Sequence, residues 1–382
     1  MNPLFTPFKI KNLELKNRVV MAPMTRSQSK QHIPGKNVVD YYRRRAEGGV
    51  GLIITEGTVI NHPAGHGYPD VPNFYGELSL AGWRQVVEAV HGAGGKIFPQ
   101  LWHVGSVRQS HQCANKGKDN PQGVCTCETP VPGYAPSAVP HPSVPTGEIP
   151  HEMTLKDIQE VIAAFAQGAE DAQRLGFDGV EIHGAHGYLI DQFFWEYTNK
   201  RSDLYGGKTL VERTRFAVEI IRAIREKVGK DFPIDFRFSQ WKMGDYTAKL
   251  AYTPQELEDF LIPLVNAGVD IFHCSTRRFW EPEFEGSPLN LAGWTKKLTG
   301  KPTITVGSVG LDKDFVTSFS SAHFSEDKHQ WDYLIQGLKQ GDFDLVAVGR
   351  SLLSDPDWSQ KILEERIREI VPFTPEVLQG LY

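Results

Sequence analysis

The chain has 382 residues, of which 40% are hydrophobic and 23% charged, with a formal net charge of −5 at pH 7. This composition is typical of a globular protein with a sizeable core, and the acidic balance argues against a nucleic-acid partner. The N-terminal residues lack the charged and apolar regions of a signal peptide, and no stretch reaches the ~20 apolar residues of a membrane span. We therefore expect a cytoplasmic protein with no membrane partner.

In chain order, residues 3–16 alternate apolar and polar side chains around an Asn-containing turn, which predicts a β-hairpin. Short β-branched runs then alternate with longer segments whose apolar residues recur every three or four positions, as in helices that cover a sheet. The predicted strands are Arg18–Ala22, Gly51–Thr55, Lys96–Leu101, Gly179–His183, Ile234–Phe238, Ile271–Ser275, Thr303–Val306 and Leu345–Val348. The predicted helices include Asn37–Glu47, Leu80–Ala93, Thr154–Leu175, Leu210–Val228 and Thr253–Ala267.

Eight strand–helix repeats without a change in composition predict a closed (β/α)8 TIM barrel, with residues 1–382 forming a single domain. An open doubly wound sheet is disfavoured, because no glycine-rich GxGxxG turn follows the first strand. We expect the hairpin to cap the barrel floor. Residues 105–152 are rich in Pro, Gly, Ser and Asn and follow the third strand, which predicts a long excursion over the barrel mouth.

The last two predicted strands end in Gly307-Ser308 and Gly349-Arg350. Glycine-rich loops at these two places are the usual phosphate site of such barrels, where backbone N–H groups and an arginine meet the charge. A phosphorylated cofactor is therefore predicted. Taken singly, Gly307 or Gly349 is more often an ordinary turn glycine than a phosphate contact.

The fourth predicted strand leads into a loop that carries His183, His186 and Tyr188. In this fold, residues at the C-terminal ends of strands form the active site. Taken alone, such a histidine pair is more often structural than catalytic. A metal site is the other alternative, but residues 21–26 at the first strand offer no ligand, so we expect no metal.

The segments APMTR, ITEG, QLWH, EIHGAHGYLIDQF, NKRSDLYGG and VGR occur in register over nearly the whole chain. Together they resemble the old yellow enzyme family of FMN-dependent ene-reductases. The resemblance implies non-covalent FMN at the barrel mouth, reduced by NADPH or NADH. It also implies ping-pong hydride transfer to the activated C=C bond of a small-molecule substrate, an α,β-unsaturated carbonyl or nitro compound.

The same resemblance implies roles at the flavin. The segment Pro23, Met24 and Thr25 would contact the cofactor, and Thr25 would form a hydrogen bond with the flavin carbonyl beside the reactive N5. The Gly57 backbone would approach the flavin ring. Gln100 and Arg237 match groups at the pyrimidine edge, where a cation near N1 would stabilise the anionic reduced flavin. Arg237 could alternatively be a core ion-pair residue, although a buried strand position requires some polar partner.

The resemblance also implies roles at the substrate. His183 and His186 match the pair of donors that hold the carbonyl or nitro oxygen, and Tyr188 matches the proton donor. Tyr68 and Trp102 fall where family members line the substrate pocket.

Two other functions are compatible with the sequence: a flavin-binding sensor or storage protein without turnover, and a different FMN-barrel reductase. A tRNA-modifying reductase is disfavoured by the negative charge, and an enzyme with an iron–sulfur site and further domains by the length of the chain. Cys113, Cys125 and Cys127 have a spacing that fits neither a zinc nor an iron–sulfur site, so we interpret them as incidental thiols. The sequence leaves open the natural substrate, the choice between NADH and NADPH, and the oligomeric state.

Overall fold

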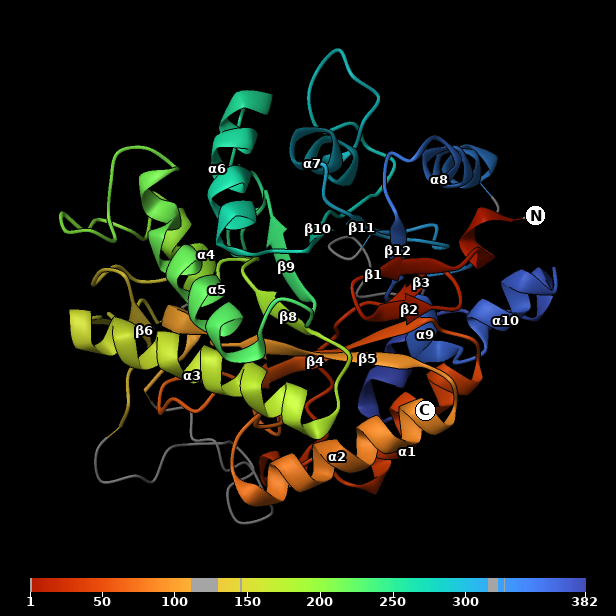
Figure 1. Ribbon diagram of the computed structural model, residues 1–382, viewed down its shortest axis with the longest axis horizontal. Coiled ribbons are helices and arrows are strands. Elements are labelled where there is room, and N and C mark those ends of the chain that lie inside the picture. Colours follow the sequence, from red (N-terminus) through yellow and green to blue (C-terminus); the bar gives the residue numbers. More distant parts are fainter. Residues whose placement is uncertain (1, 111–129, 145, 315–321, 326) are drawn as a thin grey trace.

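A computed structural model of the chain describes residues 2–110, 130–144, 146–314, 322–325 and 327–382. Its parallel strands form a closed eight-stranded barrel in which each strand pairs with the next and the last pairs with the first (Figure 1). In chain order these strands are β3 (Val19–Met21), β4 (Leu52–Val59), β5 (Lys96–Trp102), β8 (Val180–His183), β9 (Ile234–Ser239), β10 (Ile271–Ser275), β11 (Thr303–Val306) and β12 (Leu345–Val348). The predicted TIM barrel is confirmed.

Helices surround the barrel and cover the outer faces of the strands (Figure 1). The long ones are α1 (Lys36–Glu47), α2 (Glu77–Gly92), α3 (Leu155–Leu175), α5 (Arg215–Val228), α6 (Pro254–Ala267), α7 (Leu291–Thr299) and α8 (Lys328–Gln340), and the short ones are α4 (Leu189–Phe194), α9 (Arg350–Ser354) and α10 (Trp358–Leu363). The helix predicted over residues 210–228 begins later, because a 3-10 turn, Glu212–Thr214, precedes α5. Before that turn, the Thr209 hydroxyl accepts from the backbone N–H of Glu212 at 3.3 Å.

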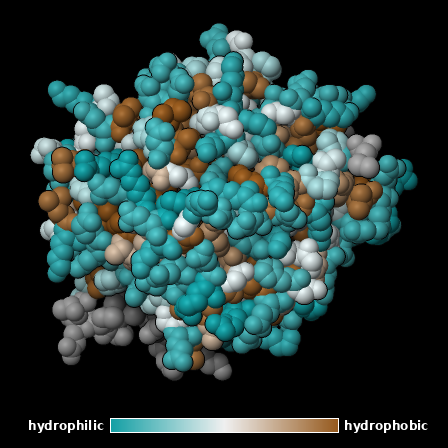
Figure 2. Space-filling model, in the orientation of Figure 1, coloured by the Kyte–Doolittle hydropathy of each residue, from teal (hydrophilic) through white to brown (hydrophobic). Residues whose placement is uncertain are grey.

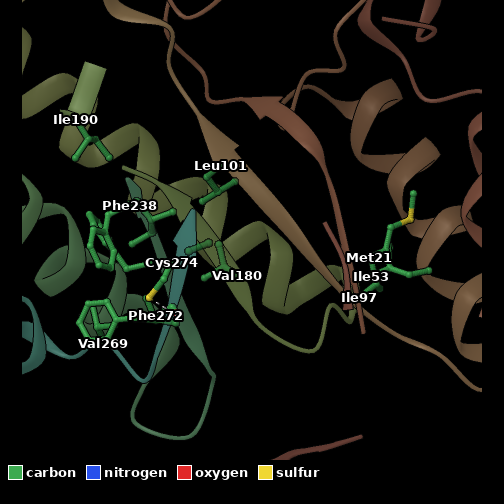
Figure 3. Packing of buried hydrophobic residues seen from close by; sticks show 14 of the residues in the cluster. Met21, Ile53, Ile97, Leu101, Val180, Ile190, Phe238, Val269, Phe272 and Cys274 are labelled. Atoms are coloured by element: carbon green, nitrogen blue, oxygen red, sulfur yellow. Dashed lines mark hydrogen bonds between the residues drawn. The ribbon is translucent and has the colours of Figure 1, made fainter. Parts of the chain in front are cut away.

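Alternating side chains along each strand divide the core into two layers. Val19 and Met21 point outward to the helices, whereas Val20 between them belongs to the cluster inside the barrel. Figure 3 shows part of the outer layer, where Phe238, Phe272 and Cys274 lie close together. Cys274 is a buried free thiol.

The predicted hairpin is present as β1 (Phe8–Ile10) and β2 (Leu13–Leu15), which pair antiparallel. Leu13 and Leu15 pack into the inner cluster against the lumen residues of the barrel strands, so the hairpin closes the barrel from below. Hydrophilic side chains dominate the face of the molecule seen in Figure 2, with apolar residues scattered among them. Among the described residues, no helix combines the length and the apolar character that crossing a bilayer would require.

The excursion after β5 is described at its two ends. It begins with the 3-10 turn Gly105–Val107 and ends with a two-stranded sheet of β6 (Tyr134–Ala135) and β7 (His151–Glu152). The region of Cys113, Cys125 and Cys127 lies outside the described residues. Between β6 and β7, His141 contacts the loop after β8, with its Nε2 3.0 Å from the carbonyl oxygen of Gly187.

Candidate active site at the barrel mouth

The loop between β8 and α4 brings His183, His186 and Tyr188 together. The His183 ring lies 5.2 Å from the His186 ring and 5.0 Å from the Tyr188 ring, measured between centroids. His183 ends β8, and the chain then turns through His186 and Gly187, whose φ angles of 65° and 79° are left-handed. The tight turn directs the three side chains to one place, as the sequence predicted.

Both histidines are neutral hydrogen-bond donors. Burial, together with the charge of Arg237, lowers the pKa of His183 to about 3 and that of His186 well below its usual range. The Nδ1 atom of His183 accepts from the backbone N–H of Ala185 at 3.3 Å, so the single proton of this ring is on Nε2. His186 Nε2 lies 2.8 Å from the Ser275 hydroxyl.

Tyr188 is a half-buried, neutral phenol. Burial and the neighbouring Tyr68 raise its pKa well above the usual value, and its hydroxyl lies 2.9 Å from that of Tyr68. Trp102 stacks on Tyr68 at 5.5 Å and meets Tyr188 edge-on at 4.9 Å between ring centroids. The two residues predicted for the substrate pocket, Tyr68 and Trp102, therefore adjoin the predicted proton donor.

Arg237 on β9 is a buried cation whose hydrogen bonding is incomplete. It donates to the Ser275 hydroxyl at 3.5 Å, and its Nε has no hydrogen-bond partner among the described residues. A buried guanidinium N–H without an acceptor is costly, so an acceptor is expected beside it. The pyrimidine ring of FMN carries such acceptors, and the residue present here therefore fits that cofactor.

The predicted cofactor residue Gln100 connects to a polar cluster that sequence reasoning missed. Its Nε2 donates to Glu181 at 2.6 Å, and His273 Nδ1 lies 2.6 Å from the other oxygen of Glu181. Burial would raise the pKa of Glu181, but His273 lowers it to about 2. Burial and the charge of Glu181 raise the pKa of Asp235 well above its usual range.

Glu181, Asp235 and His273 could also be regarded as a metal centre, since potential ligand atoms of the three lie within 4.8 Å of one another. The Glu181 oxygen and His273 Nδ1 already face each other at hydrogen-bond distance, which favours proton sharing over metal coordination. Each of the three stands inside an apolar strand, in VEIH, IDFRF and IFHC. A charged residue within such a run was the signal that could have found this cluster.

The predicted flavin contacts after β3 lie on a segment that a buried carboxylate holds. Glu56 accepts from the backbone N–H groups of Arg26 and Ser27 at 2.9 and 3.2 Å, which fixes the chain beside Thr25. Pro23 and Met24 are half-buried and Thr25 is exposed.

Gly57 lies in a strand, whereas the sequence predicted that the strand ends before it, at Thr55. It lies within β4, which continues past the predicted end to Val59 with an irregularity between Ile54 and Gly57. A Cβ atom at Gly57 would come within 2.4 Å of the Trp102 ring, so packing against Trp102 by itself accounts for the glycine.

The two predicted phosphate loops come together. Arg350 Nη2 lies 3.5 Å from the hydroxyl of Ser308, and Ser308 and Gly307 both have positive φ angles. A Cβ atom at Gly307 would come within 2.6 Å of the Thr276 carbonyl oxygen, whereas at Gly349 its nearest neighbour is Met24 Sδ at 3.5 Å. The loops after β11 and β12 thus meet near the end of β3, the arrangement that a phosphate site requires.

Comparison with known proteins identifies the family. The model of the NADH:flavin oxidoreductase / NADH oxidase family matches residues 3–323. The chain belongs to this family. Its FMN cofactor and its NAD(P)H reductant follow from that membership, and the resemblance to the old yellow enzymes is confirmed.

Individual members of the family are similar over most of the chain. The 12-oxophytodienoate reductase 7 of Oryza sativa subsp. japonica is 41% identical over 389 residues, covering 99% of this chain and 93% of that protein. The NADH oxidase of Thermoanaerobacter brockii is 37% identical over 376 residues, or 96% of this chain, which spans about half (52%) of that larger protein. A structure of morphinone reductase in complex with tetrahydroNAD superposes with a TM-score of 0.77 at 28% identity, covering 98% and 93% of the two chains. This flavin oxidoreductase is therefore an FMN-dependent ene-reductase that acts on small molecules.

Proposed function

We propose that His183 and His186 bind the carbonyl or nitro oxygen of an activated alkene and that Tyr188 protonates the carbon next to that group. The observation that carries this proposal is the convergence of two neutral imidazoles and one neutral phenol on the loop after β8. The names 12-oxophytodienoate reductase and morphinone reductase designate reductases of oxo compounds, which supports a carbonyl substrate.

Each residue has a separate task in this proposal. FMN, when bound, supplies the electron pair and hydrogen that NAD(P)H has delivered to the site. The N–H groups of His183 and His186 stabilise negative charge that develops on the substrate oxygen, because donors fixed in a dry site need no reorganisation. Tyr188 keeps its proton until the α-carbon becomes basic, since burial disfavours its phenolate.

The cofactor tasks follow the same logic. We assign Pro23, Met24, Thr25, Gly57, Gln100 and Arg237 to the ring system and Gly307, Ser308, Gly349 and Arg350 to the phosphate. Arg237 is the group that would meet negative charge on the pyrimidine edge, because the Nε–H of its buried guanidinium has no partner within the described part of the chain.

The test is anaerobic NADPH or NADH oxidation by the FMN-loaded protein, measured with and without cyclohexenone. We expect oxidation that depends on the enone and a reduced C=C bond in the product. FMN binding without enone-dependent oxidation would instead favour a sensor or storage protein.

A further inference from the structure

A buried ion pair lies directly behind the loop that carries His186 and Tyr188. Lys242, in the segment after β9, places its Nζ 2.6 Å from Asp191 Oδ1 on α4, and both side chains are only 1% exposed. Desolvating two charges costs about as much as their attraction returns, so such a pair contributes little to stability. Fixing the register of two segments is the best-attested use of a buried ion pair.

The acidic end of the pair holds the second half of the loop. The other oxygen of Asp191, Oδ2, accepts from the backbone N–H of Gly187 at 2.7 Å. The Gly187 carbonyl accepts from Gln192 Nε2 at 2.7 Å, so the backbone N–H and C=O of Gly187 are both hydrogen-bonded to side chains of α4. Tyr188 follows as the N-cap of the same helix.

The basic end holds the first half. His186 pairs with Lys242 in a β-bridge, and its carbonyl accepts from the backbone N–H of Met243 at 3.2 Å. The His186 N–H donates to the Ser239 hydroxyl at 2.9 Å, and its ring stacks on Trp241 at 4.4 Å between centroids. The ion pair therefore joins the segment that supports His186 to the helix that supports Tyr188.

We infer that Lys242 and Asp191 are positioning residues. Their ion pair fixes His186 and Gly187 so that the His186 imidazole and the Tyr188 phenol can contact the same substrate molecule. The inference rests on the proposed function of His186 and Tyr188. Neither Lys242 nor Asp191 takes part in the chemistry itself.

The charges around the pair make this inference testable. His141 and His186 face the same peptide segment and are neutral, because burial lowers the pKa of His141 to about 4 and that of His186 well below its usual range. Tyr188 is neutral as well. In a Lys242→Met variant, the ion pair is absent and an ionised Asp191 would have no counter-charge. The donor loop of that variant should be looser than in the wild type and should loosen further as pH rises.

The experiment compares three FMN-loaded variants with the wild type at about pH 6 and about pH 8. They are Lys242→Met, the neutral double variant Lys242→Met/Asp191→Asn, and Lys156→Met, which removes one side of an exposed ion pair with Glu160. The readouts are affinity for p-hydroxybenzaldehyde, measured by calorimetry relative to the wild type at each pH, and hydrogen exchange of residues 184–192.

We expect Lys242→Met to bind p-hydroxybenzaldehyde about tenfold or more weakly than the wild type, with faster exchange, and the loss should be larger at the higher pH. The double variant should also bind more weakly than the wild type, but to the same extent at both pH values, since it lacks the ion pair and buries no unpaired charge. Lys156→Met should match the wild type.

Each other outcome counts against the inference. Wild-type behaviour of Lys242→Met, beside impaired His186→Ala and Tyr188→Phe, would overturn the inference and leave the proposed function intact. Unimpaired His186→Ala and Tyr188→Phe would overturn the proposed function and the inference with it. If Lys242→Met does not fold, the double variant decides, and a double variant that binds like the wild type at both pH values overturns the inference, because it lacks the ion pair.

Discussion

Tyr68 and Tyr188 place their hydroxyl oxygens 2.9 Å apart, although 120 residues separate them in the chain. If Tyr188 gives its proton to a substrate carbon, its oxygen is left to accept from Tyr68. The second phenol is therefore positioned to stabilise the charge that Tyr188 acquires as its proton departs. Burial raises the pKa of both groups, so neither ionises beforehand.

Tyr188→Phe should affect only one half of the catalytic cycle. Flavin reduction by NAD(P)H needs no proton for a substrate carbon and should keep its rate. Reoxidation by cyclohexenone should slow by about a hundredfold, the usual loss when a general acid is removed. Nitroalkenes should be less affected, because a nitronate is stable before protonation. Rapid mixing of each half-reaction measures this, and equal losses in both halves would make Tyr188 a packing residue.

His183→Ala and His186→Ala should each weaken the binding of phenol-type ligands such as p-hydroxybenzaldehyde. Each should also slow enone reduction while leaving the FMN content unchanged. Removing one donor aimed at developing charge typically costs ~3 kcal/mol, or about a hundredfold in rate. Steady-state kinetics and phenol titration measure the effect. Added zinc serves as the control for the metal alternative, and activation of the wild type by zinc would contradict the donor role.

Arg237→Met should lower the reduction potential of the bound flavin. A buried cation near the pyrimidine edge favours the negatively charged reduced form, and methionine of similar length removes that charge. Dye-coupled potentiometry of the FMN-loaded variant measures the shift. An unchanged potential in a variant that still binds FMN would leave Arg237 as a structural residue.

Asp235→Asn should remove a pH dependence from stability. The folded-state pKa of Asp235 is raised, so the folded protein keeps a proton that the unfolded chain releases above its ordinary pKa near 4. Stability from this group therefore falls as pH rises from that value, by up to ~1.4 kcal/mol per unit. The variant should gain in Tm relative to the wild type between about pH 5 and about pH 8.

Glu181→Gln should instead lose stability at neutral pH, since the pKa of Glu181 is depressed to about 2.

The purified protein should be yellow, and acid precipitation should release its flavin. The meeting of the Ser308 and Arg350 loops supports one phosphate site, which suits FMN held without a covalent bond. Absorbance of the supernatant near the flavin bands tests this, and colour that stays with the pellet would indicate covalent attachment.

The sequence predicted those parts of the molecule that depend on local pattern. β10, β11 and β12 begin and end at the predicted residues, because each is an apolar run bounded by polar or glycine signals. β4 was predicted too short, since its second half contains Glu56, Gly57 and Thr58, which look like a loop when read alone. Their strand conformation follows from pairing with β5, which only the closed barrel supplies.

The polar groups beneath the site could not be predicted in the same way. Glu181 and His273 come from different strands and meet only because the barrel closes, as do Lys242 and Asp191 across the loop behind His186. No motif spacing encodes such contacts. His183, His186 and Tyr188 were predictable because one short loop carries all three.

The left-handed backbone of His186 also limits which amino acids can replace it. At a φ of 65°, β-branched side chains are strained, whereas asparagine and histidine adopt this conformation comparatively readily. Glycine would suit the backbone but has no side-chain donor. Asparagine alone among common substitutes combines tolerance of the turn with an N–H for the substrate, so a saturation library at position 186 should return it as the main active replacement.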